Sequence, residues 1–262
     1  MSPPVAPDRA GGSPVQAATH RLERVAVVGA GSWGTAIARH LALRGTHTFL
    51  LSRRTEHAEA MAQLRRNPDY LRTVTFPEEL QVGTYTNFNF SACDLVVLAV
   101  PSRGYAAVLE TLQPLLPVGI GILSLTKGLE PGTLRRLSVV LEETLETIAP
   151  RIAVLSGPNH AEEVSLDMPA ATVIASKDQA FAEELQTLVS DERFRAYVNY
   201  DVVGVEIAGT VKNVIAMATG AADGLGFGDN TRAAVMTRGL AEMARLGCAL
   251  GADQMTFSGL AG

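Results

Sequence analysis

Short apolar runs alternate with longer amphipathic segments along most of this 262-residue chain. Runs of this length are typical of strands that are buried on both faces of a parallel sheet. The segments between them place apolar residues at helical spacing. The runs predict strands at residues 25–28, 46–51, 94–100, 121–125, 152–155 and 172–175. The pattern therefore predicts an α/β fold in which strands and helices alternate.

The pattern changes near residue 200, after which only helical periodicity remains. Residues 202–222 and 231–250 predict two helices joined by a glycine-rich turn. The first of these helices is apolar on nearly every face, which predicts a buried central helix. Residues 1–22 lack periodicity and are rich in proline and glycine, so they predict a disordered tail. We expect an α/β domain over residues 23–200 and an all-α domain over residues 201–262.

The first predicted strand leads directly into Gly-Ala-Gly-Ser-Trp-Gly at residues 29–34, and a helix closed by Gly45 follows. In such a turn Gly29 permits the tight bend, Gly31 lets the backbone approach a pyrophosphate, and Gly34 lets helix and strand pack closely. The helix N-terminus attracts the phosphate charge. The alternative is a tight turn that binds nothing. The order of strand, glycines and helix favours a dinucleotide-binding Rossmann domain.

Two arginines, Arg53 and Arg54, follow the second predicted strand. A Rossmann site for NAD usually has a carboxylate at this place, which accepts hydrogen bonds from the ribose hydroxyls. This chain has no carboxylate there, and guanidinium groups pair well with a 2′-phosphate. The alternative is a pair of solvated surface arginines. We expect NADP(H) to be the preferred cofactor and NAD(H) to be accepted as well.

Composition narrows the classes of partner. The formal net charge is −5 and no basic cluster interleaves with aromatic residues, which argues against nucleic acid. The chain has no apolar run near 18 residues, so we expect no membrane span. Cys93 and Cys248 lie far apart and form no metal-binding spacing. Two such cysteines fit a reducing compartment and predict no metal site.

Lysine is rare in this chain, which has only Lys127, Lys177 and Lys212 against 19 arginines. A retained lysine can mark a site that needs an ammonium able to lose its proton, which arginine cannot do. Lys127 follows a predicted strand. It therefore lies at the carboxyl ends of the strands, where α/β proteins bind ligands. Lys212 lies on an apolar helical stripe, where burial would lower its pKa toward the range that proton transfer requires. The alternative is a lysine that reaches water between helices.

A Gly-Pro turn interrupts the chain between two predicted strands, within Ser-Gly-Pro-Asn-His-Ala-Glu-Glu at residues 156–163. The backbone N–H groups of such a turn suit an anion. The alternative is an ordinary turn in which Asn159 or Glu162 caps a helix. His160 is expected to be a packing or capping residue rather than a catalyst.

Together these motifs resemble the bacterial-type NAD(P)-dependent glycerol-3-phosphate dehydrogenases. The resemblance rests on G-A-G-S-W-G-T-A at 29–36, N-x-x-Y-L at 67–71, A-V-P-S at 99–102, S-L-T-K-G-L-E at 124–130, S-G-P-N-H-A-E-E at 156–163, E-I-A-G-T-V-K-N at 206–213 and D-G-L-G-F-G-D-N-T-R-A-A at 223–234. It implies a cytoplasmic oxidoreductase that reduces dihydroxyacetone phosphate to sn-glycerol 3-phosphate for glycerophospholipid synthesis. The partners implied are this small substrate and a second copy of the chain in a homodimer.

The same resemblance assigns roles by position. The cofactor contacts it implies, beside the three glycines, are Ser32, Trp33, Arg53, Arg54, Lys127 and Ala161, with Tyr70 as a weaker candidate. The substrate contacts it implies are Lys127, Gly157, Asn159 and Lys212. Lys212 would take the proton in oxidation and return it in reduction, while Lys127 supports the charge that develops on the substrate.

The resemblance departs at the last residues, Gly-Leu-Ala-Gly at 259–262. Family members continue there into an Asp-containing loop and an Arg-Asn pair that grips the substrate phosphate. We therefore expect a truncated helical domain, an incomplete substrate site and low turnover. Leu71-Arg72, where the family commonly has Leu-Pro, is a smaller departure. Two alternatives stay open: an NADP-dependent reductase of ketopantoate or hydroxyacid type, and a non-catalytic NADP(H)-binding fragment.

Overall fold

A computed structural model of the chain describes residues 22–261, which contain one eight-stranded sheet of order β3-β2-β1-β4-β5-β6-β7-β8. The strands are β1 (Arg24–Val28), β2 (His47–Ser52), β3 (Leu80–Thr84), β4 (Leu95–Leu98), β5 (Gly121–Ser124), β6 (Arg151–Ser156), β7 (Ala170–Ala175) and β8 (Phe194–Asn199). Neighbouring strands are parallel except β6 and β7, which are antiparallel. The predicted α/β fold is confirmed, and the two edge strands β3 and β8 add to the six that were expected.

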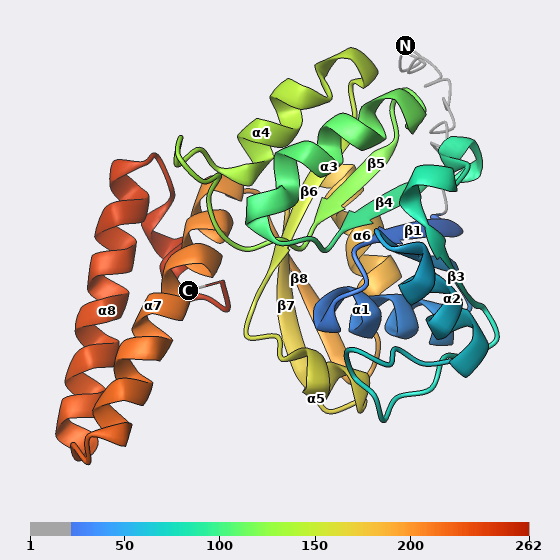
Figure 1. The fold of residues 1–262 in the computed structure, drawn as a ribbon. Helices are drawn as coiled ribbons and strands as arrows, with labels where there is room; N and C mark the ends of the chain where they lie inside the picture. Colours follow the sequence, from blue (N-terminus) through green and yellow to red (C-terminus); the bar gives the residue numbers. More distant parts are fainter. Residues whose placement is uncertain (1–21, 262) are drawn as a thin grey trace, which may run out of the picture.

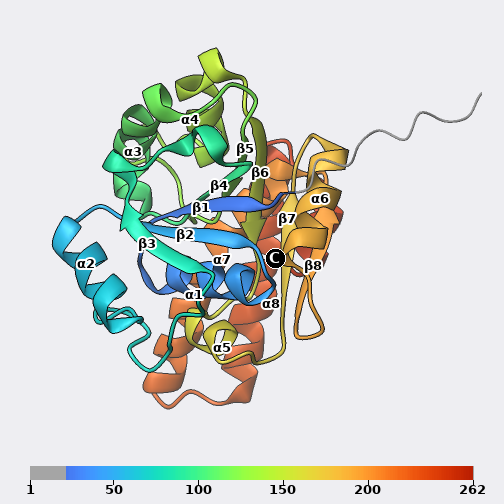
Figure 2. The ribbon, with the colours of Figure 1, turned by 90° about the vertical axis from the view of Figure 1, so that its right-hand side faces the viewer.

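Helices cover both faces of this sheet (Figures 1 and 2). One face carries α1 (Ser32–Leu43), α5 (Ala161–Ser165) and α6 (Gln179–Val189), and the other carries α3 (Tyr105–Leu112) and α4 (Leu137–Thr144). Helix α2 (Thr55–Leu64) lies beside β3 at the edge of the sheet. Single 3₁₀ turns are η1 (Tyr85–Asn87), η2 (Phe90–Ala92), η3 (Ser102–Gly104), η4 (Gln113–Leu115), η5 (Glu146–Ile148) and η6 (Gln254–Ser258).

The central strand β1 contributes to two separate cores. Val25 and Val27 face the core under α1 and α6, whereas Ala26 and Val28 face the core under α3 and α4. All four side chains are fully buried, as a parallel sheet covered on both faces requires. Residues 1–21 of the predicted tail lie outside the described part of the chain. Leu22 is described and packs against the first core.

A pair of long helices, α7 (Val202–Gly224) and α8 (Asp229–Ala249), follows the sheet and extends to one side of it (Figure 1). The first turns of α7 pack against β6, β7 and Phe257 of η6 in a third core. The expectation of a buried helix is wrong for the rest of α7, where Val214 and Met217 are 59% and 67% exposed. The reason is that, among the described residues, α8 is the main element packed along this stretch.

Helix α7 bears on the expectation that the chain has no membrane span. By length and composition it is apolar enough to cross a bilayer, although we expected no segment of the chain to be so. One helix of this kind is weak evidence for insertion, because buried core helices share its composition.

The carboxylate of Glu206 joins α7 to the start of α4. It accepts hydrogen bonds from the Arg136 guanidinium at 2.8 Å and from the Ser138 backbone N–H at 2.9 Å, just at the start of α4. Glu206 is 9% exposed at its side chain, so removing either partner would leave a nearly buried charge uncompensated. The ion pair fixes the first turns of α7 relative to α4.

Two glycines allow β1, α1 and β4 to meet closely. Gly29 has φ +114°, and a Cβ there would lie 2.3 Å from the Ala99 carbonyl oxygen. A Cβ on Gly34 would lie 1.9 Å from the Gly29 carbonyl oxygen. Neither contact leaves room for a side chain, so the approach of α1 to β1 depends on both glycines.

This packing predicts opposite effects for one substitution made in two helices. Gly34→Ala forces α1 away from β1 and should lower the free energy of unfolding by about 2 kcal/mol or more. Gly220→Ala, in α7 with open space around the new Cβ, should raise it by up to about 1 kcal/mol through helix propensity. Urea unfolding of both variants measures the difference. Equal midpoints for the two variants would contradict the packing described.

Candidate active site

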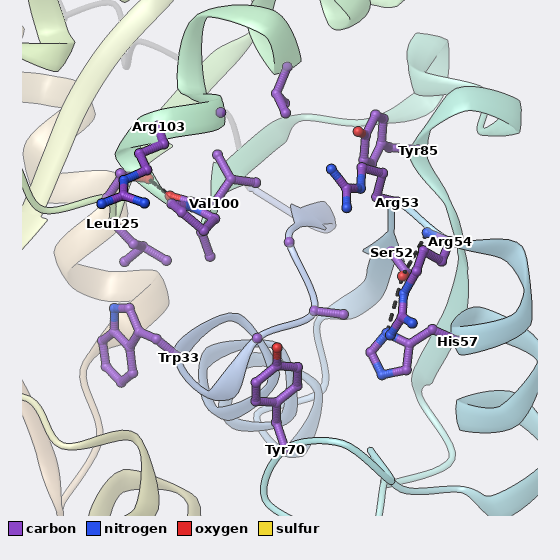
Figure 3. A pocket seen from close by; sticks show the side chains of 18 of the residues that line it. Trp33, Ser52, Arg53, Arg54, His57, Tyr70, Tyr85, Val100, Arg103 and Leu125 are labelled. Atoms are coloured by element: carbon purple, nitrogen blue, oxygen red, sulfur yellow. Dashed lines mark hydrogen bonds between the residues drawn. The ribbon is translucent and has the colours of Figure 1, made fainter. Parts of the chain in front are cut away.

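A cleft of about 800 Å³ opens at the carboxyl ends of β1, β2, β4 and β5 (Figure 3). Residues expected from the sequence that line it are Gly29, Gly31, Trp33, Arg53, Arg54, Tyr70 and Lys127. Residues not expected are Ala30, Ser52, His57, Tyr85, Ala99, Val100, Pro101, Arg103, Gly104, Val108, Leu125 and Thr126. The cleft lies where strand order reverses around β1, which is the usual ligand site of open α/β sheets. That rule already points to the loop after β4, which contributes Arg103.

The glycine turn forms one wall of the cleft. Gly31 caps α1 without any side-chain hydrogen bond, and the first turn of α1 has no acidic residue. The N–H groups of that turn have no intrahelical partner, and the positive end of the helix dipole lies beside them. A Cβ on Gly31 would meet nothing within 4 Å. The turn therefore leaves its N–H groups and the space above Gly31 open to an anion such as a pyrophosphate.

The basic end of the cleft lies on the opposite side from Trp33, with Arg53, Arg54 and Tyr85 close together (Figure 3). Among residues 22–261, Arg53 makes no ion pair. Arg54 pairs with Asp69, at 2.8 Å between Nη2 and Oδ2. The two residues directly after β2 are arginines, but the fold brings a carboxylate to them from the loop after α2. This corrects the expectation of a purely basic end.

A buried amide, Asn67, joins the two sides of the cleft. Its Nδ2 donates to the Ala30 carbonyl at 3.0 Å and to the Thr35 hydroxyl at 2.8 Å, within the glycine turn and α1. Its Oδ1 lies 3.0 Å from Nε2 of His57, whose Nδ1 lies 3.2 Å from the Ser52 hydroxyl at the end of β2. Asn67 is fully buried. The asparagine belongs to the N-x-x-Y-L motif, but nothing in the sequence assigned it this role.

Lys127 lies just beyond β5, where the cleft ends. Its Nζ donates to the Gly157 carbonyl at 3.1 Å, so it connects the loop after β5 to the loop after β6. Burial lowers the pKa of this ammonium. A partly desolvated lysine that lines a cleft is suited to hold an anionic ligand or to support charge on one.

Lys212, on α7, has a buried ammonium group without a hydrogen-bond partner among the described residues. Burial, and then the charge of Lys127, lowers the pKa of Lys212 to about 8. Lys212 lies close enough to Lys127 to be affected by its charge, but it is not among the residues that line the cleft. The nearby carboxylate on the same helix, Glu206, is bound by Arg136. An ammonium in this state can give up and regain a proton near neutral pH.

The loop after β6 holds three of the other predicted contacts, and none of them lines the cleft. The Asn159 side chain is turned toward β7, where Nδ2 donates to the Ala171 carbonyl at 2.8 Å and Oδ1 accepts from the Thr172 hydroxyl at 2.9 Å. Gly157 accepts from Lys127, and Ala161 is buried at the start of α5. Ser32 and Gly34 also belong to the turn without lining the cleft.

Comparison with known proteins agrees with this geometry. The family model described as NAD-dependent glycerol-3-phosphate dehydrogenase N-terminus matches residues 24–182, and that for the C-terminus matches residues 201–262. A glycerol-3-phosphate dehydrogenase [NAD(P)+] of Corynebacterium aurimucosum is 48% identical over 92% of this chain and 73% of its own length. That of Halalkalibacterium halodurans is 43% identical over 92% of this chain and 70% of its own length.

A solved structure extends the likeness to three dimensions. The crystal structure of glycerol-3-phosphate dehydrogenase from Coxiella burnetii has a TM-score of 0.87 and 39% identity, and the match covers 92% of this chain and 73% of that one. Sequence and fold therefore agree over the sheet and over the helix pair that carries Lys212. The chain belongs to the NAD-dependent glycerol-3-phosphate dehydrogenase family.

Proposed function

We propose that this chain reduces dihydroxyacetone phosphate to sn-glycerol 3-phosphate with NAD(P)H and so supplies glycerophospholipid synthesis. The observation that carries the proposal is the buried Lys212, which lies beside Lys127 and is unpartnered among the described residues. Lys127 lies at one end of a cleft whose other parts are an open glycine turn and two arginines. The names of the relatives, glycerol-3-phosphate dehydrogenase [NAD(P)+], fit this reaction and either cofactor. A ketopantoate or hydroxyacid reductase is not favoured, because both halves of the chain match this family.

The cleft fits a nicotinamide dinucleotide. The glycine turn, with Gly29, Gly31 and Gly34, would hold the pyrophosphate on its open N–H groups. The further cofactor contacts we assign are Ser32, Trp33, Arg53, Arg54, Tyr70, Lys127 and Ala161. Arg53 and Arg54 are suited to the 2′-phosphate, so NADP(H) is preferred and NAD(H) is accepted. When bound, the nicotinamide supplies the hydride that reaches C2 of the ketone.

Lys212 then manages the proton. In reduction its ammonium donates a proton to the substrate oxygen that gains charge, and in oxidation the neutral amine takes that proton back. Lys127 places a second positive charge near this oxygen and stabilises the developing negative charge. We assign Gly157 and Asn159 to the substrate side with these two lysines. Reduction needs protonated Lys212, which is present below its pKa of about 8, and oxidation needs the neutral form above it.

The working form that we propose is a cytoplasmic homodimer with one α/β domain over residues 23–200 and one helical domain over residues 201–262. Cys93 and Cys248 are both free thiols, which fits a reducing compartment. The family models divide the chain in a similar way.

Replacing Lys212 tests the chemistry. Lys212→Met should lower the single-turnover rate constant for dihydroxyacetone phosphate by about 100-fold or more, because the proton donor is lost. Lys212→Arg should not rescue it, because arginine keeps its proton. The rate is read from NADPH absorbance in single turnover, with Lys177→Met, at an exposed lysine paired with Glu142, as the control. Substantial activity of the arginine variant would exclude proton transfer by Lys212.

Replacing Arg53 tests the cofactor assignment. Arg53→Ala should weaken NADPH by about 1–3 kcal/mol and NADH by much less, because only NADPH has a 2′-phosphate to lose its charge-assisted bond. Trp33, the one tryptophan of the chain, lines the cleft, so its emission should change saturably with either nucleotide and report both dissociation constants. Equal weakening of the two cofactors would reject the assignment, and a wild-type chain with no saturable response would contradict the cleft as the cofactor site.

A further inference from the structure

Arg54 and Asp69 form an ion pair at the edge of the proposed cofactor site. Nη2 of Arg54 lies 2.8 Å from Oδ2 of Asp69, and their side chains are 58% and 47% exposed. Arg54 lines the cleft and Asp69 does not. Exposed pairs of this kind are weak and exchange readily with other partners. A ligand phosphate that reaches Arg54 therefore competes with the Asp69 carboxylate for the same guanidinium.

The position of Asp69 is fixed from behind by the buried Asn67. Oδ1 of Asn67 accepts the backbone N–H groups of Asp69 and Tyr70, each at 3.1 Å. Nε2 of His57 lies 3.6 Å from Oδ2 of Asp69. Asn67 is fully buried and His57 is nearly so. The backbone of Asp69 is thus held by a built turn, which keeps its carboxylate within reach of Arg54.

The same network also binds the backbone of Arg54. Because Nδ2 of Asn67 donates to the Ala30 carbonyl, its Oδ1 faces His57, and Nε2 of His57 must be the donor in that contact. In the neutral ring Nδ1 then accepts from the Ser52 hydroxyl, whose oxygen accepts the Arg54 backbone N–H at 3.2 Å. One hydrogen-bonded chain therefore positions both members of the ion pair.

We propose that Asp69 is a positioning residue that acts through Arg54 and sets the ratio of affinities for NADPH and NADH. The inference rests on the proposed function, since it takes the cleft as the cofactor site. NADPH must draw Arg54 away from Asp69 or share it, because the 2′-phosphate and the carboxylate bind the same guanidinium. NADH carries no 2′-phosphate, so it leaves the pair intact. Asp69 thereby selectively weakens NADPH and lets the chain use both cofactors.

The test is Asp69→Asn, which keeps the shape of the side chain and removes its charge. The dissociation constant for NADPH should fall about three- to tenfold, while that for NADH should stay within about twofold. Both are measured by Trp33 emission and by calorimetry. Asp69→Glu restores the carboxylate and should return the ratio of the two constants toward the wild-type value, which a purely structural role of the loop does not predict.

Two controls locate the effect at the ion pair. In an Arg54→Ala background, Asp69→Asn should change NADPH binding by less than about twofold, because the partner is gone. Glu56→Gln removes a carboxylate from the first turn of α2, where the described residues give it no ion pair. It should leave the ratio unchanged. The advantage of Asp69→Asn should also shrink as salt is added.

The outcomes separate this inference from the function beneath it. Equal changes for both nucleotides, an undiminished effect without Arg54, or the same effect from Glu56→Gln would overturn the role of Asp69. Failure of the wild-type chain to bind either nucleotide would overturn the proposed cofactor site itself. A selective gain for NADPH that disappears with Arg54 supports both.

Discussion

The crossing of α1 over β1 and β4 is the contact on which the rest of the site depends. Gly34 leaves 1.9 Å between a notional Cβ and the Gly29 carbonyl oxygen, and Gly29 leaves 2.3 Å to the Ala99 carbonyl oxygen. Because α1 begins so close to the sheet, its N-terminus opens onto the carboxyl ends of the strands. Asn67 then ties this turn to the end of β2. The cleft is therefore a consequence of backbone packing, and the charged side chains are arranged around it.

A second close approach positions Lys212, the residue that we propose as proton donor. A Cβ on Gly209 would lie 2.2 Å from the Ser156 hydroxyl oxygen, so glycine at this position lets α7 pack close to the end of β6 without displacing that side chain. Glu206 fixes the same turns through Arg136. Lys212, one turn later, is thereby buried near Lys127, and burial with like charge lowers its pKa to about 8.

The sequence predicted the parts of the fold that local pattern determines. The six inner strands were predicted because each is an apolar run, and burial of the Lys212 ammonium was predicted because its helical stripe is apolar. Edge strand β3 was missed because it is only partly buried. Strand β8 was missed although the alternation of buried Phe194 and Ala196 with exposed Arg195 and Tyr197 could have indicated it. Burial of all of α7 was predicted wrongly, because apolar composition does not say what packs against a helix.

The Arg54–Asp69 pair and the Asn67 network join residues up to 37 positions apart, and no local pattern predicts such contacts.

The most direct test of this account is an NMR titration of the isotope-labelled chain with NADPH, read at the backbone amides. The account predicts saturable shifts at Ser32, Trp33 and Gly34, with matching shifts at Lys127. A second hollow, of about 900 Å³, lies at the amino ends of β1 and β2, beside Arg44 and Glu183. Shifts that cluster there, with the glycine turn unchanged, would contradict the claim that the crossing of α1 and β1 builds the cofactor site.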